Sequence, residues 1–240
     1  MRTIRIENIP DFLRRLWKEH HDAFLFRGQA CPWPLVPSIA RWEHLLEGFD
    51  DWRIFQDSLI NEFAKYGSQH LRKKPKDFLE LLINAQHHGV PTCLLDFSLS
   101  PLKALYFAVF QEEHDNSDGA FWSLTPKDHL EDFTKNSKLN LSNLEFFLPR
   151  QINYRLVAQQ GCFAAFPMPQ TKDSILTLDE KKAYSKSIER IQKWFVPAKS
   201  KKQLRIELAL IGIRPRTMFP DLDGVALDQI FQLKLGGNIY

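Results

Sequence analysis

The chain has 240 residues and a formal net charge of +3, and 44% of its residues are hydrophobic and 25% charged. This is the composition of a globular protein, and it excludes bulk disorder. The cysteines Cys31, Cys93 and Cys162 show no CxxC pairing, which argues against a disulfide framework and a cysteine zinc site. No signal core follows Met1, and no apolar run is long enough to span a bilayer. We therefore expect a cytoplasmic protein with unpaired thiols, no metal and no membrane partner.

Hydrophobic periodicity predicts alternating short strands and helices in the first part of the chain. Prolines and glycines mark where these elements end. A buried strand at 23–26 delivers Arg27-Gly28-Gln29 at its end, where polar residues are candidate site residues. The other elements predicted here are a strand at 3–7, helices at about 10–19, 41–66 and 75–89, and an extended segment at 92–97.

The later part of the chain continues the same alternation. Ser100-Pro101 combines a capping residue with a proline at the first helical position, so a buried helix is predicted to begin there. Because no internal repeat is evident, we predict one α+β domain over residues 1–240, with a central mixed or antiparallel sheet flanked by helices. The remaining predicted elements are strands at 119–124, 162–166 and 194–196, a polar excursion at about 126–148, and helices capped at Thr177, Ser200 and Asp221 or Asp223.

Four segments of the sequence together resemble the FRG domain, a family named for its Phe-Arg-Gly motif. Their order and spacing extend the resemblance over about residues 24–231. Cys93 stands where the family usually has an arginine, and Phe97 where it has a tryptophan, so a ligand that contacts that arginine would be bound differently here. The segments are Phe26-Arg27-Gly28-Gln29; Gln86 to Thr92 with Leu94-Leu95-Asp96 and Ser100-Pro101-Leu102; Arg155 with Gln159-Gln160-Gly161; and Phe219 to Gly224.

Polar residues of these segments allow a functional and a structural interpretation. Arg27 can clamp a phosphate or carboxylate through two hydrogen bonds, or form an internal ion pair with Asp96. Gly28 leaves room for a close approach to the backbone. The helix after Ser98 and Ser100 can accept an anion at its N-terminus, or Ser100 can serve only as its cap.

An arginine combined with a Ser-x-Ser turn before a helix also resembles the first two parts of the ADP-ribosyltransferase site. This resemblance implies an NAD-dependent transferase in which Arg27 and the helix terminus at Ser100 hold the phosphates. The glutamate that forms the third part of such a site has no evident counterpart. Gln159 or Gln160 is the candidate replacement, although an amide cannot act as a base.

We expect all these groups to converge in one cleft that takes NAD or another nucleotide and no metal. Both side chains of the pair His87-His88 cannot easily bind one metal ion, because adjacent helical residues diverge by about 100°. His87 is better suited to hydrogen bonding. The catalytic candidates are Arg27, His87, Asp96 and Gln160, and the ligand-binding candidates are Gln29, Thr92, Ser98, Ser100 and Gln159.

Three functions remain open on sequence alone. The first is an ADP-ribosyltransferase-like enzyme, a class that includes bacterial toxins and antiphage effectors, acting on an unidentified acceptor. The second is a non-catalytic module that binds a nucleotide or a phosphorylated partner. The third is a nucleic-acid-associated protein that uses the basic segment 181–216, with its seven Lys and four Arg against two Glu, together with Trp194 and Phe195. The plain alternative for this segment is a solvent-facing helix surface.

Overall fold

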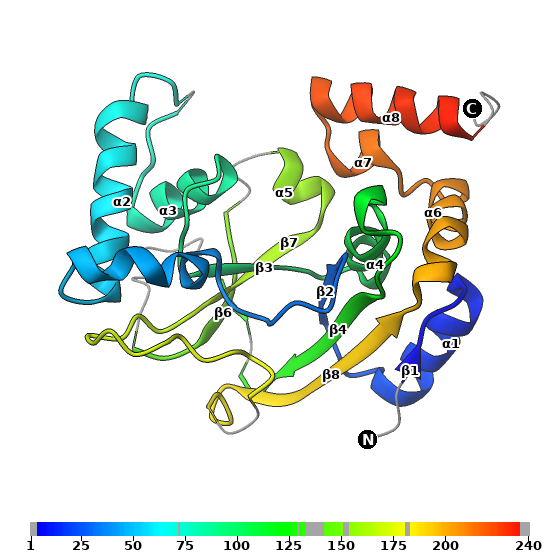
Figure 1. Ribbon diagram of the computed structural model, residues 1–240, viewed down its shortest axis with the longest axis horizontal. Coiled ribbons are helices and arrows are strands. Elements are labelled where there is room, and N and C mark those ends of the chain that lie inside the picture. The colour runs from blue at the N-terminus through cyan, green and yellow to red at the C-terminus, as the bar shows by residue number, and fades with distance from the viewer. Residues whose placement is uncertain are drawn as a thin grey trace.

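A central mixed sheet organises the structure, a computed structural model that describes residues 4–71, 73–128, 130–132, 142–150, 154–180 and 183–235. The strands are β1 (Ile4–Arg5), β2 (Leu25–Gln29), β3 (Leu94–Ser98), β4 (Gly119–Pro126), β5 (Glu131–Asp132), β6 (Glu145–Leu148), β7 (Gly161–Ala165) and β8 (Ile188–Val196). Among the described residues they form one eight-stranded sheet in the order β1-β8-β4-β2-β3-β7-β6-β5 (Figure 1). The pairs β1–β8 and β5–β6 are parallel and the others antiparallel, so the predicted α+β class with a mixed sheet is confirmed.

Side-chain caps begin most of the longer helices, as the sequence indicates. The caps Asn8, Asp51, Asp77, Ser100 and Asp221 each accept a hydrogen bond from a backbone N–H three residues later. The α-helices are α1 (Ile9–His20), α2 (Trp52–Gly67), α3 (Phe78–His87), α4 (Pro101–Val109), α5 (Tyr154–Ala158), α6 (Lys201–Leu210), α7 (Pro215–Met218) and α8 (Leu222–Lys234). Short 3-10 helices are η1 (Ser38–Gly48), η2 (Glu112–His114) and η3 (Ala198–Ser200).

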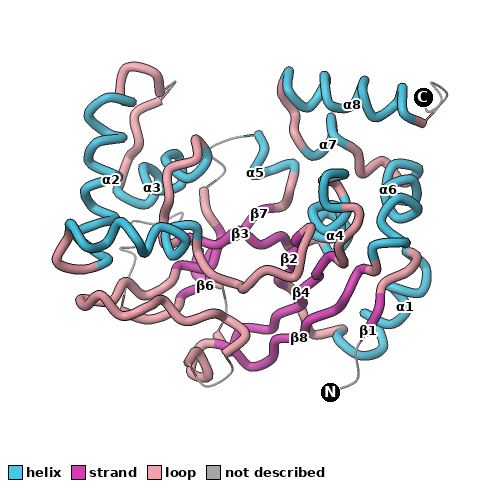
Figure 2. Tube along the Cα trace, in the orientation of Figure 1, coloured by secondary structure: helices cyan, strands magenta, loops and turns pink. Residues whose placement is uncertain are grey.

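Two hydrophobic clusters hold the helices on the sheet. One lies where α1, α4 and α6 cover β4 and β8, and its centre is the edge-to-face contact of Phe12 and Phe121, with ring centroids 4.9 Å apart. The other packs η1, α2 and α3 against β3, β6 and β7. Figure 2 shows these two groups of helices at opposite ends of the sheet. The middle of the sheet lies between them.

Several boundaries in the first part of the chain differ from the sequence-based predictions, and two of them have a clear physical cause. The predicted strand 23–26 continues to Gln29, because the ladder between β2 and β4 runs on to the pair Gln29↔Ala120. The predicted helix 41–66 is two elements, η1 and α2, because Asp51 accepts from the Ile54 N–H at 2.8 Å and caps a new helix. The motif Arg27-Gly28-Gln29 therefore belongs to β2 itself.

Two further predictions need correction. The excursion 126–148 contains β5 and β6, and its residues 129 and 133–141 lie outside the described residues. No helix begins at Thr177 in the described chain; the Glu180 N–H donates to the Thr177 carbonyl at 3.1 Å and closes an isolated turn. The capping-box spacing is satisfied here by a turn alone, whereas α6 does begin after Ser200.

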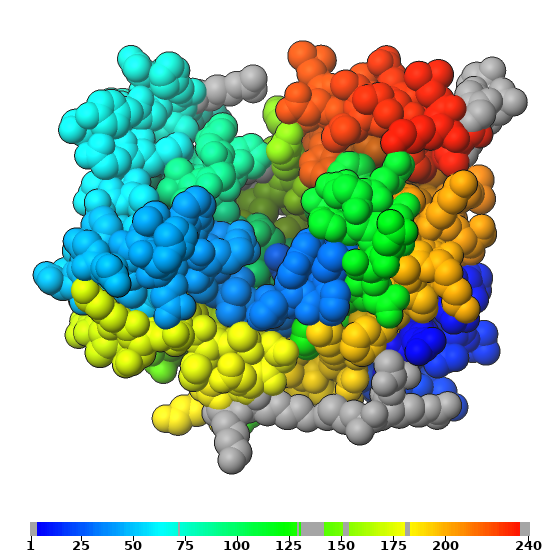
Figure 3. All heavy atoms as spheres, viewed as in Figure 1, coloured from blue at the N-terminus to red at the C-terminus, as the bar shows by residue number. Residues whose placement is uncertain are grey.

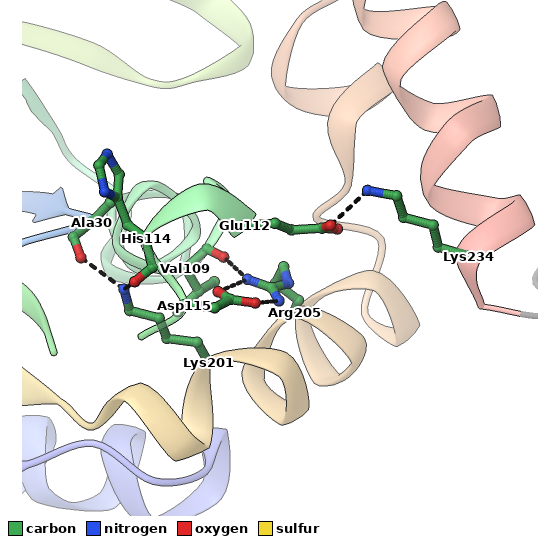
Figure 4. Close-up of polar contacts among 8 residues, drawn as sticks. All are labelled: Ala30, Val109, Glu112, His114, Asp115, Lys201, Arg205 and Lys234. Carbon is green, nitrogen blue, oxygen red and sulfur yellow. Dashed lines mark hydrogen bonds and ion pairs between the residues drawn. The ribbon is translucent and has the colours of Figure 1, made fainter. Parts of the chain in front are cut away.

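The basic segment 181–216 faces solvent only in part: Lys186, Lys199, Lys202 and Arg216 are exposed, whereas Lys201, Arg205 and Arg214 are buried. It is also not one helix surface, because residues 188–196 form β8. Lys201 is fully buried and donates to the carbonyls of Ala30 and His114, at 2.7 and 2.6 Å (Figure 4). Arg205 makes two bonds to the Asp115 carboxylate. Trp194 is also fully buried, which leaves its ring unavailable for stacking on a nucleic-acid base.

Candidate functional site

A cavity forms where β2 and β3 move apart in the middle of the sheet. β2 pairs with β4 at five positions and β3 pairs with β7 at five, whereas β2 and β3 pair only at Phe26↔Ser98. The space beyond this pair is a cavity of about 850 Å³, walled by residues of β2, β3, β7, α3, α4 and α5 and of the segment 33–41. Figure 3 shows the molecule hollowed between α3 and α4. The cavity therefore lies at a seam, where two strands lack most of their ladder.

Arg27 bridges this seam. Its Nη1 donates to the main-chain oxygen of Asp96 at 2.6 Å, so the side chain serves an acceptor that the missing ladder leaves unpaired. Its Nε is buried without a hydrogen-bond partner. Burial lowers the pKa of Arg27, and the nearby Asp96 carboxylate opposes that change. The structure thus gives Arg27 a tethering contact, made with the Asp96 backbone.

Gly28 has a packing role that differs from the one expected. A Cβ at this position would lie 1.9 Å from the carbonyl oxygen of Ala104 and 2.8 Å from the nitrogen of Ala108. Both atoms belong to α4, which lies directly against β2. The missing side chain therefore admits a helix to the strand, whereas the sequence had suggested room for a ligand.

Asp96 is held by a short chain of hydrogen bonds. Its Oδ2 accepts from Gln86 Nε2 at 2.9 Å, and Gln86 Oε1 accepts in turn from the hydroxyl of the buried Thr92. The Asp96 side chain is exposed to the cavity that it lines, while protein surrounds it on its other sides. The surrounding protein raises the pKa of Asp96 through desolvation, and the charge of Arg27 lowers that pKa by a smaller amount. Thr92 is not part of the described lining and acts through Gln86.

Three other candidates line the cavity while holding its walls. Gln29 Oε1 accepts from the indole N–H of Trp122 at 3.1 Å. Ser98 Oγ donates to the carbonyl of Gln159 at 2.7 Å, and Gln159 Nε2 donates to the carbonyl of Met218 at 3.2 Å. These bonds link β2 to β4, β3 to the end of α5, and α5 to α7.

The remaining candidates divide by position. His87 lines the cavity at the end of α3, and burial, His88 and Arg155 lower its pKa. Ser100 caps α4 at Lys103 and is not part of the described lining. Gln160 also lies off the lining, and its φ of 48° places it in the left-handed region before β7. The structure therefore brings together Arg27, Gln29, His87, Asp96, Ser98 and Gln159, but not Thr92, Ser100 and Gln160.

Two further arginines line the cavity. Arg155 Nε lies 2.5 Å from Asp221 Oδ2, its Nη2 lies 3.5 Å from Asp223, and its guanidinium lies 5.4 Å from the ring centre of Phe219. Arg41 is exposed on η1 and makes no hydrogen bond or ion pair with the described part of the chain. The positive charge of Arg155 is therefore already compensated, whereas that of Arg41 is not.

Aromatic side chains supply an apolar wall. Phe107 lies in α4 and Phe110 caps its C-terminal end, and their ring centroids lie 6.2 and 5.8 Å from that of Phe219. Trp33 lines the cavity as well and packs edge-on against His114. Such a wall suits a flat ring system, which can stack on or pack against these faces.

Residues 22–117 match the family model of the FRG domain. The chain contains an FRG domain. No match was found among curated proteins or solved structures. The matched segment runs from just before β2 to just after η2, so the FRG domain includes the tether Arg27, Gly28, the Asp96 carboxylate and Arg41. The extension of the family resemblance to residue 231, which would include Arg155 and Phe219, stays a prediction, as does the domain range 1–240.

The sequence offered a signal for some of the cavity residues that were not among its candidates. Arg155 stands four residues before Gln159 in a short helical segment, a spacing that places both on one helix face. Gln86 belongs to the segment that carries the family resemblance. Arg41 gave no signal, because a single arginine in a polar helical stretch usually faces solvent.

Three general features complete the description of the structure. Among the described residues, no group of three or more His, Cys, Asp or Glu side chains is arranged to hold a metal ion. The structure identifies Cys31, Cys93 and Cys162 as free cysteines, as predicted. In the part of the chain that the structure describes, no helix combines the length and apolar character that crossing a membrane requires.

Proposed function

We propose that the cavity of the FRG domain binds a nucleotide, with the ring system against the aromatic wall and the phosphates at Arg41. The observation that carries this proposal is the combination, in one cavity of about 850 Å³, of Phe107, Phe110 and Phe219 with a guanidinium that has no partner in the described chain. An arginine of this kind binds phosphate oxygens in pairs, in a geometry that a lysine cannot reproduce.

The phosphate position in this proposal differs from the one that the sequence suggested. Arg27 is tethered to Asp96, and Ser100 uses its hydroxyl to cap α4. Arg155 is paired with Asp221 and Asp223. Arg41 is therefore the lining arginine that a phosphate meets without displacing a hydrogen bond or ion pair of the described chain.

With NAD as the bound nucleotide, the proposal extends to an enzymatic activity, ADP-ribosyl transfer. In ADP-ribosyl transfer, the bond between nicotinamide and the ribose breaks and a nucleophile of an acceptor forms a new bond to the same carbon. Asp96 supplies a carboxylate in the described lining, a group that stabilises the positive charge developing on the ribose. A role as a bacterial toxin or antiphage effector would follow from this activity. Without turnover, the same cavity would serve as a cytoplasmic nucleotide-binding module.

Titration of the protein with ADP and with NAD tests the proposal, using Arg41→Gln and a matched control. Loss of a charge-assisted hydrogen bond costs about 1.5–3 kcal/mol, so Arg41→Gln should weaken binding roughly tenfold or more. Arg53 is exposed on α2 away from the cavity lining, and Arg53→Gln should bind as the wild type does. Equal affinities in Arg41→Gln and wild type, or no binding of either nucleotide, would refute the proposal.

Release of nicotinamide tests the enzymatic form separately. The protein is incubated with NAD and cell lysate, and free nicotinamide and labelled acceptor are measured. Binding of NAD without release of nicotinamide would leave the binding module and eliminate the transferase. Asp96→Asn should reduce release if the carboxylate stabilises the ribose charge.

A further inference from the structure

Opposite charges meet at the seam between β2 and β3. Arg27 extends from β2 and Asp96 from β3, and the bond from Arg27 Nη1 to the Asp96 main chain keeps the two residues adjacent. Each also has a polar atom that makes no hydrogen bond within the described chain: Nη2 of Arg27 and Oδ1 of Asp96. The lining thus offers one donor and one acceptor on two residues joined by a hydrogen bond, and the pair carries no net charge.

Hydrogen bonds within the protein hold both Asp96 and Arg27 in place before any ligand binds. Gln86 holds Asp96 Oδ2, and Thr92, buried beneath, holds Gln86. Arg27, on β2, is held by its hydrogen bond to the main-chain oxygen of Asp96 on β3. These bonds hold Arg27 Nη1 and Asp96 Oδ2, and Arg27 Nε is buried, so each residue presents one remaining atom to the cavity and the arrangement is pre-organised.

We propose that this Arg27–Asp96 pair binds an uncharged amide carried by the ring of the ligand. The amide oxygen accepts from Arg27 Nη2, and the amide N–H donates to Asp96 Oδ1. An amide supplies both an acceptor and a donor, whereas a carboxylate supplies acceptors only and repels Asp96. This inference rests on the proposed nucleotide binding and specifies both the ring substituent and its orientation, with the amide at the seam and the phosphates at Arg41.

The amide should be preferred strongly over the corresponding acid. A carboxylate in its place leaves Asp96 Oδ1 without a donor and brings two negative charges together in the cavity. A buried polar group left without its partner costs about 1–3 kcal/mol, and like charge adds to this cost. We expect a preference of at least about tenfold.

Two dinucleotides that differ only at this group provide the test. Nicotinamide adenine dinucleotide carries the amide, and nicotinic acid adenine dinucleotide carries the acid; both have the same rings and phosphates. Calorimetric titration of the wild-type protein should give at least tenfold tighter binding of the amide form. In Asp96→Asn the preference should largely disappear, because the new side-chain amide can donate to a carboxylate. Asp179→Asn, an exposed change that is not part of the described lining, should keep it.

The outcomes separate this inference from the proposed function. Equal affinity of the wild type for both dinucleotides, with Arg41→Gln weakening both, would overturn the amide assignment and leave nucleotide binding in place. Tighter binding of the acid form would also overturn it. A wild-type preference retained in a folded Asp96→Asn would remove Asp96 from the site. Failure of both dinucleotides and of ADP to bind would refute the proposed function, and the amide assignment with it. The wild-type comparison stands even if a variant does not fold.

Discussion

Each residue of the Phe-Arg-Gly motif has a separate structural task. Phe26 stacks on Phe121 in the hydrophobic cluster beneath α4, with ring centroids 5.9 Å apart. Arg27 crosses the seam to Asp96, and Gly28 lets α4 lie against β2. Three consecutive residues therefore join a core, a cavity and a helix–sheet contact, which explains why they occur as a unit.

Substitution of Gly28 tests the packing role directly. Gly28→Ala places a methyl group 1.9 Å from the Ala104 carbonyl, and backbone atoms can yield only if α4 moves as a whole. We expect a loss of about 3 kcal/mol of unfolding free energy, which lowers the melting temperature by roughly 6–12 °C. Gly48→Ala is the matched control, because nothing lies within 4 Å of an added Cβ there. A Gly28→Ala protein that melts with the wild type would show that the contact with α4 is looser than described.

Sequence reasoning located part of the site for a physical reason. Arg27, Asp96 and Ser98 are polar residues set among apolar neighbours, and such groups must share partners or face a cavity. That requirement predicts that they lie close together, and all three line the cavity. Arg41 could not be found this way, since an exposed arginine has no such requirement. Gln160 was misplaced because its sequence neighbours suggest a strand start, whereas it lies off the described lining with a left-handed φ of 48° just before β7.

At the scale of elements, capping and periodicity located helices well and strand ends poorly. Asp51 splits a stretch that periodicity alone joins into one helix, because a single cap outweighs continued helical spacing. The end of β2 depends on its partner: the ladder with β4 carries the strand three residues past the apolar run. The local sequence therefore indicates a helix start in part, through its capping residue. It does not indicate where a strand ends, because that depends on the partner strand.

The end of α1 carries a histidine that should make stability depend on pH. His20 is buried, its Nδ1 lacks a partner, and its ring lies 5.3 Å from that of Trp194. Burial, followed by Arg190, lowers its pKa, with Glu19 opposing. The unfolded chain therefore takes up a proton first as pH falls, and stability is lost below about pH 6.5.

Urea unfolding at pH 7.5 and pH 5.5 measures this contribution. His20→Phe keeps a ring beside Trp194 and removes the titrating group, so the difference in unfolding free energy between the two pH values should shrink relative to wild type. His21→Phe, at the exposed neighbouring position, controls for loss of a histidine as such. An unchanged pH difference in His20→Phe would assign the acid sensitivity to other groups.

At the scale of the whole molecule, the α+β class follows from the alternation of elements, but the strand order does not. β1 and β8 come from opposite ends of the sequence and pair in parallel, and β2 lies between β4 and β3. These neighbours are chosen by contacts distant in sequence, and the seam between β2 and β3 is a product of that order. The cavity could therefore be predicted to exist but not to lie within the sheet.

The reactivity of the three cysteine thiols reports how the whole molecule is packed. Cys93, just before β3, and Cys162 in β7 are both buried, and burial raises the pKa of Cys93 to about 12 and also raises that of Cys162. Cys31 is partly exposed. A disulfide-exchange reagent at pH 8 should therefore react rapidly with one thiol in the native protein and with all three in denaturant. Rapid reaction of two or more native thiols would contradict the described packing of β3 against β7.

The single backbone pair between β2 and β3 has a mechanical consequence. Along the seam, the sheet is held by one rung and by a side chain that reaches across in place of the others. A molecule bound there would contact the polar groups that a neighbouring strand normally pairs with, and it would connect the two strands. The same unpaired groups would then both bind the molecule and join β2 to β3. The protein would therefore be most rigid when the cavity is occupied.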